Sequence, residues 1–140
     1  MSKLQIIIDS VAAAIGAALG FLFGEVNGLF WALIAFMALD YITGVIVAII
    51  NKRLSSEVGF KGICRKVLIF VLVGMANILD MHVIGTGCVL RTAVLFFYIS
   101  NEGVSVLENA GHLGLPVPAR LLNVLEQLHE DAEQEDIDNE

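Results

Sequence analysis

The sequence predicts an all-α integral membrane protein, and three observations lead to this prediction. Hydrophobic side chains make up 57% of the 140 residues and charged ones only 16%, whereas soluble domains carry about 45–50% apolar and about 25% charged residues. Four apolar segments approach the roughly 20 residues that a helix needs to cross a bilayer. The charged side chains gather mainly in the segment 51–66 and at the C-terminal end. We therefore expect four transmembrane helices, over residues 4–23, 29–50, 66–82 and 87–107.

The negative charge of the chain is concentrated at its C-terminus. The formal net charge is −7, but residues 126–140 hold eight acidic side chains and no basic one. The remaining residues carry seven acidic and eight basic side chains, so the body is nearly neutral. This distribution gives no surface for nucleic acid, and it predicts a solvated acidic tail.

The first span, residues 4–23, is expected to be an uncleaved membrane helix, because Asp9 would interrupt the apolar core of a signal peptide. Gly16, Gly20 and Gly24 follow one another at G-x-x-x-G spacing. In a membrane helix this spacing lets another helix approach closely. The partner helix can lie in the same chain or in another copy.

Polar residues interrupt the later spans at helical spacing. Asp40, Thr43 and Gly44 share a face of the second span, and Arg91, Tyr98, Glu102, Ser105 and Asn109 form one stripe on the fourth. Such groups normally face a bundle interior or water, since a charge at a helix centre costs roughly 2.5–3.5 kcal/mol. The candidates for buried or pore-lining polar groups are Asp40, Thr43, Asn77, Asp80, Arg91, Tyr98, Asn101, Glu102, Ser105 and Glu108.

Two interpretations of these polar groups stay open. In the first, they pair: Asp40 or Asp80 with Arg91, and Glu102 with a basic residue of the loop between spans two and three. Asp40 can alternatively carry a proton. In the second, the stripes line an aqueous path or an interface between copies.

The segment 51–66 fixes the expected orientation. It holds five basic side chains against Glu57 alone: Lys52, Arg53, Lys61, Arg65 and Lys66. Basic loops stay on the cytoplasmic side, so both termini are expected inside and the turns near 24–28 and 80–86 outside. This loop is also expected to bind anionic lipid. A three-span alternative makes one of the last two segments re-entrant.

After the fourth span, Gly111 and Gly114 can end the helix, and Pro116 and Pro118 suit the start of another. We therefore expect a transmembrane domain over residues 1–115, a short cytoplasmic amphipathic helix over 116–130 and a disordered acidic tail over 131–140. The amphipathic helix presents Leu121, Leu122, Leu125 and Leu128 on one face.

Signatures of catalysis are missing from the sequence. It contains no G-x-S-x-G, H-E-x-x-H, Walker A or dinucleotide-binding motif. His82, His112 and His129 have no ligand spacing, and Cys64 and Cys88 stand alone. We therefore expect no enzyme, no cofactor and no metal site.

Two stretches resemble the bacteriophage holin family, which includes clostridial toxin-secretion holins. The first is "ALDYITGVIVAIINKRLSSEVGFKGICRK" (38–66) and the second is "FYISNEGVSVLENAGHLGLPVP" (97–118). The family pattern has four parts in order: Asp-Tyr-x-x-Gly, a Ser-bearing basic loop with Gly and a terminal Lys, Asn-Glu…Glu-Asn, and Gly-x-Pro-x-Pro. The residues that match the first two parts are Asp40, Tyr41, Gly44, Ser55, Ser56, Gly59, Gly62 and Lys66. Those that match the last two parts are Asn101, Glu102, Ser105, Glu108, Asn109, Gly114, Pro116 and Pro118.

The resemblance covers roughly residues 30–128 and implies a non-catalytic holin. Such a protein forms homo-oligomers in the bacterial cytoplasmic membrane, opens lesions that depolarise it, and releases an endolysin for host lysis or a toxin. In this hypothesis Asp40, Arg91 and Glu102 would favour assembly or line the pore, and Gly44 is a packing position. Gly16, Gly20 and Gly24 lie outside the resemblance and are expected to be packing positions from their spacing alone. The alternatives are a small subunit of a transporter or ion channel, and an antiholin that regulates another holin.

Overall fold

A computed structural model describes residues 2–85 and 87–138, and the described chain is helical over most of its length. Its elements are α1 (Lys3–Phe23), α2 (Gly28–Ile50), α3 (Ser56–Ile78), the π-helical segment η1 (Leu79–Ile84) that continues α3, α4 (Val89–His112) and α5 (Ala119–Asp138). No β-strand occurs in these described ranges. The predicted all-α class is confirmed.

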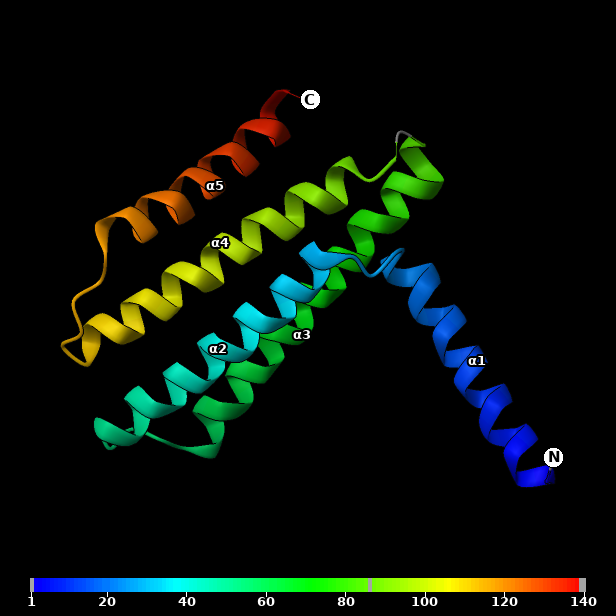
Figure 1. The fold of residues 1–140 in the computed structure, drawn as a ribbon, viewed down its shortest axis with the longest axis horizontal. Coiled ribbons are helices and arrows are strands. Elements are labelled where there is room, and N and C mark those ends of the chain that lie inside the picture. The colour runs from blue at the N-terminus through cyan, green and yellow to red at the C-terminus, as the bar shows by residue number, and fades with distance from the viewer. Residues whose placement is uncertain (1, 86, 139–140) are drawn as a thin grey trace.

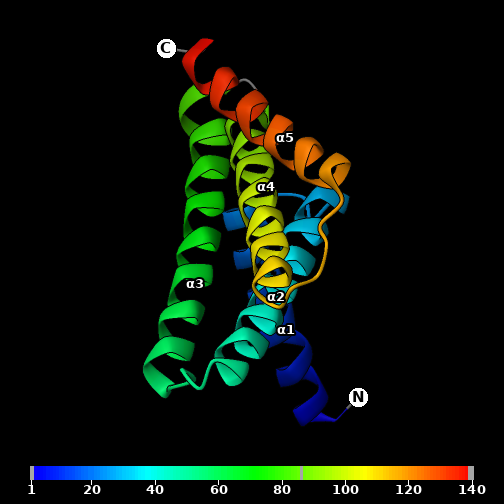
Figure 2. The ribbon, with the colours of Figure 1, turned by 90° about the vertical axis from the view of Figure 1, so that its left-hand side faces the viewer.

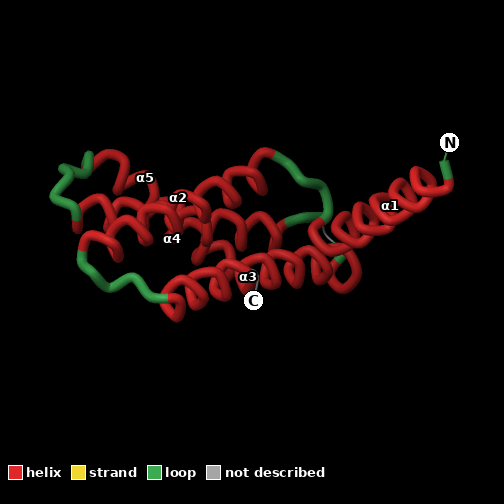
Figure 3. Tube along the Cα trace, turned by 90° about the horizontal axis from the view of Figure 1, so that it is seen from below, coloured by secondary structure: helices red, strands yellow, loops and turns green. Residues whose placement is uncertain are grey.

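Helices α2, α3 and α4 run side by side, with α3 antiparallel to the other two (Figures 1 and 2). The turn around residues 24–27, the end of η1 and the start of α4 lie toward one end of this bundle, and the loops 51–55 and 113–118 lie at the other (Figure 1). Helix α5 folds back along α4, and α1 projects away from the bundle at a steep angle (Figures 1 and 3). The three-helix bundle, and not α1, therefore holds the core.

The core is a single apolar cluster between α2, α3 and α4. Leu33, Val73 and Leu95 are completely buried at its centre. On α2, however, the outward side chains are also apolar, and Ile42 and Ile46 are exposed. A helix that is apolar on all sides is typical of a membrane span, because one face packs on protein and the other contacts lipid.

Helix α1 is joined to the bundle only near its C-terminus. The Asn77 side-chain amide donates hydrogen bonds to the carbonyl oxygens of Phe21 (3.3 Å) and Leu22 (3.1 Å). These carbonyls have no partner within the last turn of a helix, so Asn77 caps α1. At Gly16 and Gly20 a Cβ would meet no atom within 4 Å. Of the predicted glycine strip, only Gly24 lies against another helix of this chain.

Gly24 is expected to be intolerant of any side chain. Its φ is +70°, and a Cβ would lie 2.6 Å from Oδ1 of Asn77. We expect Gly24→Ala to lower the free energy of unfolding by about 2–3 kcal/mol, since it adds a clash to backbone strain. Chemical unfolding in detergent micelles, followed by circular dichroism, measures this loss.

The control for this change is Gly85→Ala. Gly85 has a similar φ of +71° but has open space around it, so alanine there should cost only the left-handed strain, about 1–2 kcal/mol. Equal losses at the two positions would contradict a role for the Asn77 contact.

The basic loop is shorter than predicted, because α3 begins at Ser56. The Ser55 hydroxyl accepts a hydrogen bond from the backbone N–H of Val58 (3.2 Å) and so caps the helix. Glu57 lies in the first turn, where the helix dipole favours an acid, and pairs with Lys61 at 2.8 Å. Only Lys52 and Arg53 stay in the loop 51–55. The other three basic residues, Lys61, Arg65 and Lys66, lie on α3.

Other boundaries also differ from the predicted ones. The third helix reaches Ile84 through η1 and α4 reaches His112, two and five residues past the predicted ends. Helix α5 continues to Asp138, across the segment for which we expected disorder from residue 131 onward. Glu, Gln and Ala are good helix formers, and the Gln127 amide bonds to Asp131 at 2.8 Å. Residues 139–140 of the predicted tail lie outside the described residues.

Among the residues that the structure describes, three helical segments are long and apolar enough to span a membrane: α1, α2 and the continuous helix Ser56–Ile84. Helix α4 has sufficient length but a polar stripe that includes Arg91, Glu102 and Glu108. The chain is therefore a helical membrane protein, and its fourth crossing is not decided by apolar length alone.

Candidate functional site

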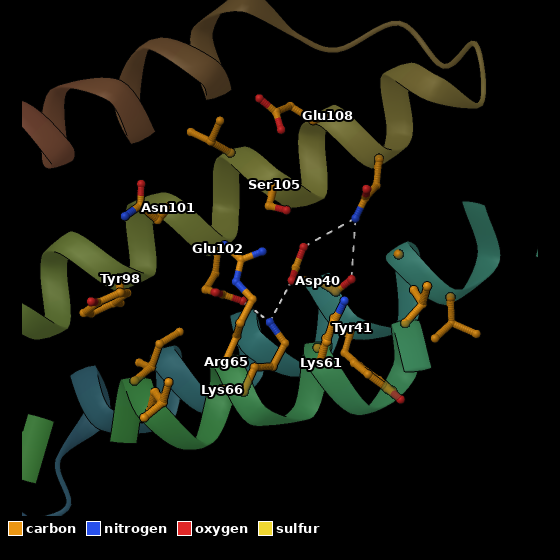
Figure 4. Close-up of a pocket in the computed structure, with 18 of the residues that line it drawn as sticks. Asp40, Tyr41, Lys61, Arg65, Lys66, Tyr98, Asn101, Glu102, Ser105 and Glu108 are labelled. Atoms are coloured by element: carbon orange, nitrogen blue, oxygen red, sulfur yellow. Dashed lines mark hydrogen bonds and ion pairs between the residues drawn. The ribbon is translucent and has the colours of Figure 1, made fainter. Parts of the chain in front are cut away.

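Three charged side chains from three different helices meet inside the bundle. The Lys66 ammonium on α3 lies 2.7 Å from Oδ2 of Asp40 on α2 and also pairs with Oε2 of Glu102 on α4. Figure 4 shows the lysine between the two acids. The three side chains are only 12–19% exposed. We call Asp40, Lys66 and Glu102 the charged cluster.

Asn109 and Thr43 extend the cluster on the side of Asp40. The Asn109 amide donates to the Thr43 hydroxyl (2.9 Å) and lies 3.4 Å from Oδ1 of Asp40. The Thr43 hydroxyl in turn bonds to the carbonyl oxygen of Leu39 (2.9 Å). Both oxygens of Asp40 therefore have a partner, so a carboxylate can be kept within apolar helices.

The depth of the cluster follows from helix lengths. Asp40 lies ten residues before the end of α2, Lys66 ten after the start of α3, and Glu102 ten before the end of α4. All three ends lie at the same end of the bundle (Figure 1). At 1.5 Å per residue, each group is about 15 Å from its helix end. This is half of a hydrocarbon core about 30 Å thick.

The charged cluster borders a cleft of about 1300 Å³ between α2, α3, α4 and α5. Four of the five residues of the predicted α4 stripe line it, namely Tyr98, Glu102, Ser105 and Asn109, and Arg91 does not. Tyr98 lies toward one end of the cleft and Glu108 toward the other (Figure 4). The α3 wall is basic and the α5 wall carries acids and a histidine. The polar residues that line it are Asp40, Tyr41, Lys61, Arg65, Lys66, Tyr98, Asn101, Glu102, Ser105, Glu108, Asn109, Glu126, His129 and Glu130.

Asn77, Asp80 and Arg91 lie toward the other end of the bundle and do not join the cluster. Asp80 is buried and accepts hydrogen bonds from the backbone N–H groups of Leu90 (3.1 Å) and Arg91 (2.8 Å), so it caps α4. The Arg91 guanidinium donates to the carbonyl oxygen of Glu25.

The predicted pairing of Arg91 with Asp40 or Asp80 is wrong, since the ion pairs of the described residues include neither and Asp80 meets only the backbone N–H of Arg91. The pairing of Glu102 with a basic residue of segment 51–66 is confirmed. Helices α2 and α4 are parallel (Figure 1). Asp40 lies past the middle of α2, whereas Arg91 lies in the first turn of α4. Arg91 is therefore too far along the bundle to reach Asp40.

Several packing residues were missed from the sequence. Tyr41 lies against Gly59 and Gly62: a Cβ on Gly59 would be 3.4 Å from its hydroxyl oxygen, and a Cβ on Gly62 would be 3.3 Å from its ring. The i, i+3 spacing of these glycines was the available signal, because it places both on one face. A Cβ on Gly44 would lie 3.8 Å from the Asn109 amide nitrogen, at ordinary van der Waals distance.

The arrangement is a hydrogen-bonded ion network in an open cleft between helices. Within the described residues, no group of three His, Cys, Asp or Glu side chains could hold a metal ion. Chemically, two carboxylates around one ammonium can hold three helices together or, when separated, can line a path for water and ions.

Comparison with known proteins gives a family match over most of the chain. The model of the bacteriophage holin family matches residues 17–130. An uncharacterised protein of Listeria innocua is 41% identical over 122 residues, which cover 87% of this chain and 86% of that protein. A protein of Bacillus phage phi105 described as a probable holin is 39% identical over 114 residues, covering 81% of this chain and 83% of its own.

A Clostridium perfringens protein, described as an uncharacterised 14.9 kDa protein, is 39% identical over 116 residues, covering 83% of this chain and 88% of that protein. No solved structure matches the chain.

Proposed function

This chain belongs to the bacteriophage holin family, and from that premise we propose that it self-associates in the cytoplasmic membrane of a bacterium and opens lesions there. The lesions depolarise the membrane and let an endolysin reach the wall or a toxin leave the cell. The chain acts without catalysis, and its partners are its own copies and membrane lipids.

The charged cluster is the observation that best supports this proposal. Each charge placed near mid-depth in hydrocarbon costs roughly 2.5–3.5 kcal/mol, and a chain built only to anchor would avoid three of them. In a single copy, Lys66 partly offsets both acids. The cost of placing these charges in hydrocarbon favours a closed bundle in a single copy, because they pair there. When copies assemble, the same cost favours a water-filled interior between them, because the charged groups can face water.

For the membrane arrangement, we propose that α4 is a fourth span and that both termini are cytoplasmic. The loop 51–55 carries Lys52 and Arg53 at the end of the bundle that also holds the loop 113–118. Trp31 is 61% exposed in the first turn of α2, at the opposite end, and tryptophan prefers the interface. The polar stripe of α4 faces the cleft, which makes its crossing feasible.

Two surfaces support assembly in this proposal. The open faces at Gly16 and Gly20 suit close packing of α1 on a helix of another copy. Lys52, Arg53 and the exposed Lys61 lie toward the proposed cytoplasmic end, where they can bind anionic lipid.

The test is induced expression in bacteria with a membrane-potential dye and a co-expressed endolysin. We expect a lag, then an abrupt loss of potential followed by lysis, because lesions form only once enough copies assemble. Cells that express the endolysin alone serve as the control and should keep both potential and wall. Normal growth with an intact membrane potential would contradict the proposal, provided that immunoblotting confirms the protein in the membrane.

The same experiment separates the alternatives. A transporter or channel subunit would give solute-specific flux that cells tolerate, and the endolysin would stay inside. An antiholin would delay lysis by a second holin expressed in the same cells.

A further inference from the structure

Helix α5 packs along α4, and its Leu125 lies at Gly103, beside Phe36 of α2; we call this seat the groove. Leu125 is 5% exposed, and its methyl groups occupy the place where a side chain at position 103 would project. A Cβ on Gly103 would lie 2.9 Å from Leu125 and 2.9 Å from the Phe36 ring. The seat for Leu125 therefore exists because residue 103 is glycine.

A second contact lies one turn further along α5. The His129 ring lies over Phe97 with their centroids 4.7 Å apart, and its Nδ1 is 3.5 Å from the hydroxyl of Ser100. Ser100 is completely buried, and Ala132 of α5 is 4% exposed. Helix α5 thus covers α4 over almost two turns, as Figure 2 also shows.

The exposed side chains of α5 are incompatible with lipid. Glu126, Glu130, Asp131 and Glu133 are all exposed, and Glu126 and Glu130 border the cleft. The part of α4 that α5 covers, residues 97–103, includes the level of Glu102, about 15 Å from the helix end. Four carboxylates at that depth in hydrocarbon would each carry a large insertion cost. A docked α5 and a lipid-facing groove therefore exclude each other.

We propose that α5 is an autoinhibitory cover. Docked in the groove of Gly103, Ser100 and Phe36, it keeps this side of α2 and α4 facing water and closed to other copies. Its release lets the side enter the bilayer, where a helix of a second copy takes the place of α5. This inference rests on the proposed lesion-forming function.

The direct test locks α5 in place. Ser100→Cys and His129→Cys are combined in a chain that carries Cys64→Ser and Cys88→Ser, reconstituted in dye-loaded vesicles of bacterial lipid. Oxidation should join α5 to α4 and reduce dye release about tenfold or more, and reduction should restore it. A chain with Ser100→Cys alone is the control and should respond to neither treatment. Equal release from the oxidised and reduced forms, with the cross-link verified, overturns the proposal, as does faster release from the oxidised form.

A test in cells weakens the docking instead. Leu125→Glu should shorten the lag before depolarisation about twofold or more, because a charge cannot occupy the glycine seat. Val124→Glu adds the same charge at a neighbouring residue that is 53% exposed, and should leave the lag unchanged. A chain ending at Pro118 removes the cover altogether and should behave like Leu125→Glu.

These measurements distinguish a failure of the autoinhibitory role of α5 from a failure of the proposed holin function. The autoinhibitory role of α5 is overturned, and the holin function left intact, by one result. In that result the truncated chain and Leu125→Glu both show an unchanged or longer lag, while they reach normal membrane levels and the unmodified chain causes lysis. Absence of depolarisation and of dye release for the unmodified chain and all variants contradicts the proposed function itself.

Discussion

Replacing Lys66 with methionine is expected to lower the free energy of unfolding of the bundle by about 3–5 kcal/mol, because it leaves two largely buried carboxylates without their cation. Lys66 is the only side chain that pairs with both Asp40 and Glu102 among the ion pairs of the described residues. Methionine keeps the length and apolar volume of the side chain, so the decrease in the free energy of unfolding reports the effect of removing the charge. Chemical unfolding in detergent micelles, followed by circular dichroism, gives the value.

The matched control is Lys61→Met on the same helix. Lys61 also pairs with an acid, Glu57, but both side chains are more than 70% exposed. Exposed pairs contribute little, so this change should alter the free energy of unfolding by less than about 1 kcal/mol. Similar losses for the two variants would contradict a special role for the charged cluster.

Restoring charge balance should rescue part of the loss. Asp40→Asn and Glu102→Gln, added to Lys66→Met, remove the unpaired charges while keeping polar atoms for Asn109. We expect the triple variant to be more stable than Lys66→Met alone, since the interaction among neighbouring groups is not additive. In contrast, Asp40→Asn and Arg91→Gln should act additively, because these side chains do not meet.

Replacing Asp80 with alanine is expected to lower the free energy of unfolding by about 1–3 kcal/mol for each of two donors that lose their acceptor. The donors are the backbone N–H groups of Leu90 and Arg91 at the start of α4. The negative charge of the carboxylate is also stabilised by the positive end of the α4 dipole. The same detergent unfolding experiment measures the loss.

Two further variants test the capping explanation. Asp80→Asn keeps one acceptor oxygen and loses the charge, so it should cost about half as much as alanine. Asp9→Ala removes an exposed acid from α1 and should change the free energy of unfolding by less than about 0.5 kcal/mol. A loss for Asp80→Asn equal to that of Asp80→Ala would show that charge, and not the two hydrogen bonds, is what α4 requires.

Much of the fold was predictable because its elements are set locally. Apolar length placed α1 and α2 within one residue at each end, and the polar stripe of α4 was visible as a helical repeat. Most of that stripe does line one cleft. The capped start of α3 was missed, since residues 56–66 mix polar and apolar side chains and their charges suggested a loop.

The partner of each polar group was harder to predict. Any acid of spans two and three could have matched Arg91 by composition, and Asp80 caps a helix that begins nine residues later. Such a cap depends on how α4 packs against η1, which no local pattern of residues shows. The equal distance of Asp40 and Lys66 from the hairpin loop was the usable signal, once the start of α3 is known.

The sequence by itself determined that this is a helical membrane protein with polar groups on its spans, because hydropathy and periodicity are properties of the chain alone, and its motifs pointed to the holin family. Only the tertiary structure decided that Asp40 and Glu102 share Lys66, that Asn77 and Asp80 cap helices, and that α5 closes over Gly103. Those contacts join residues far apart in the chain, and they depend on the relative placement of the helices, which local spacing does not specify.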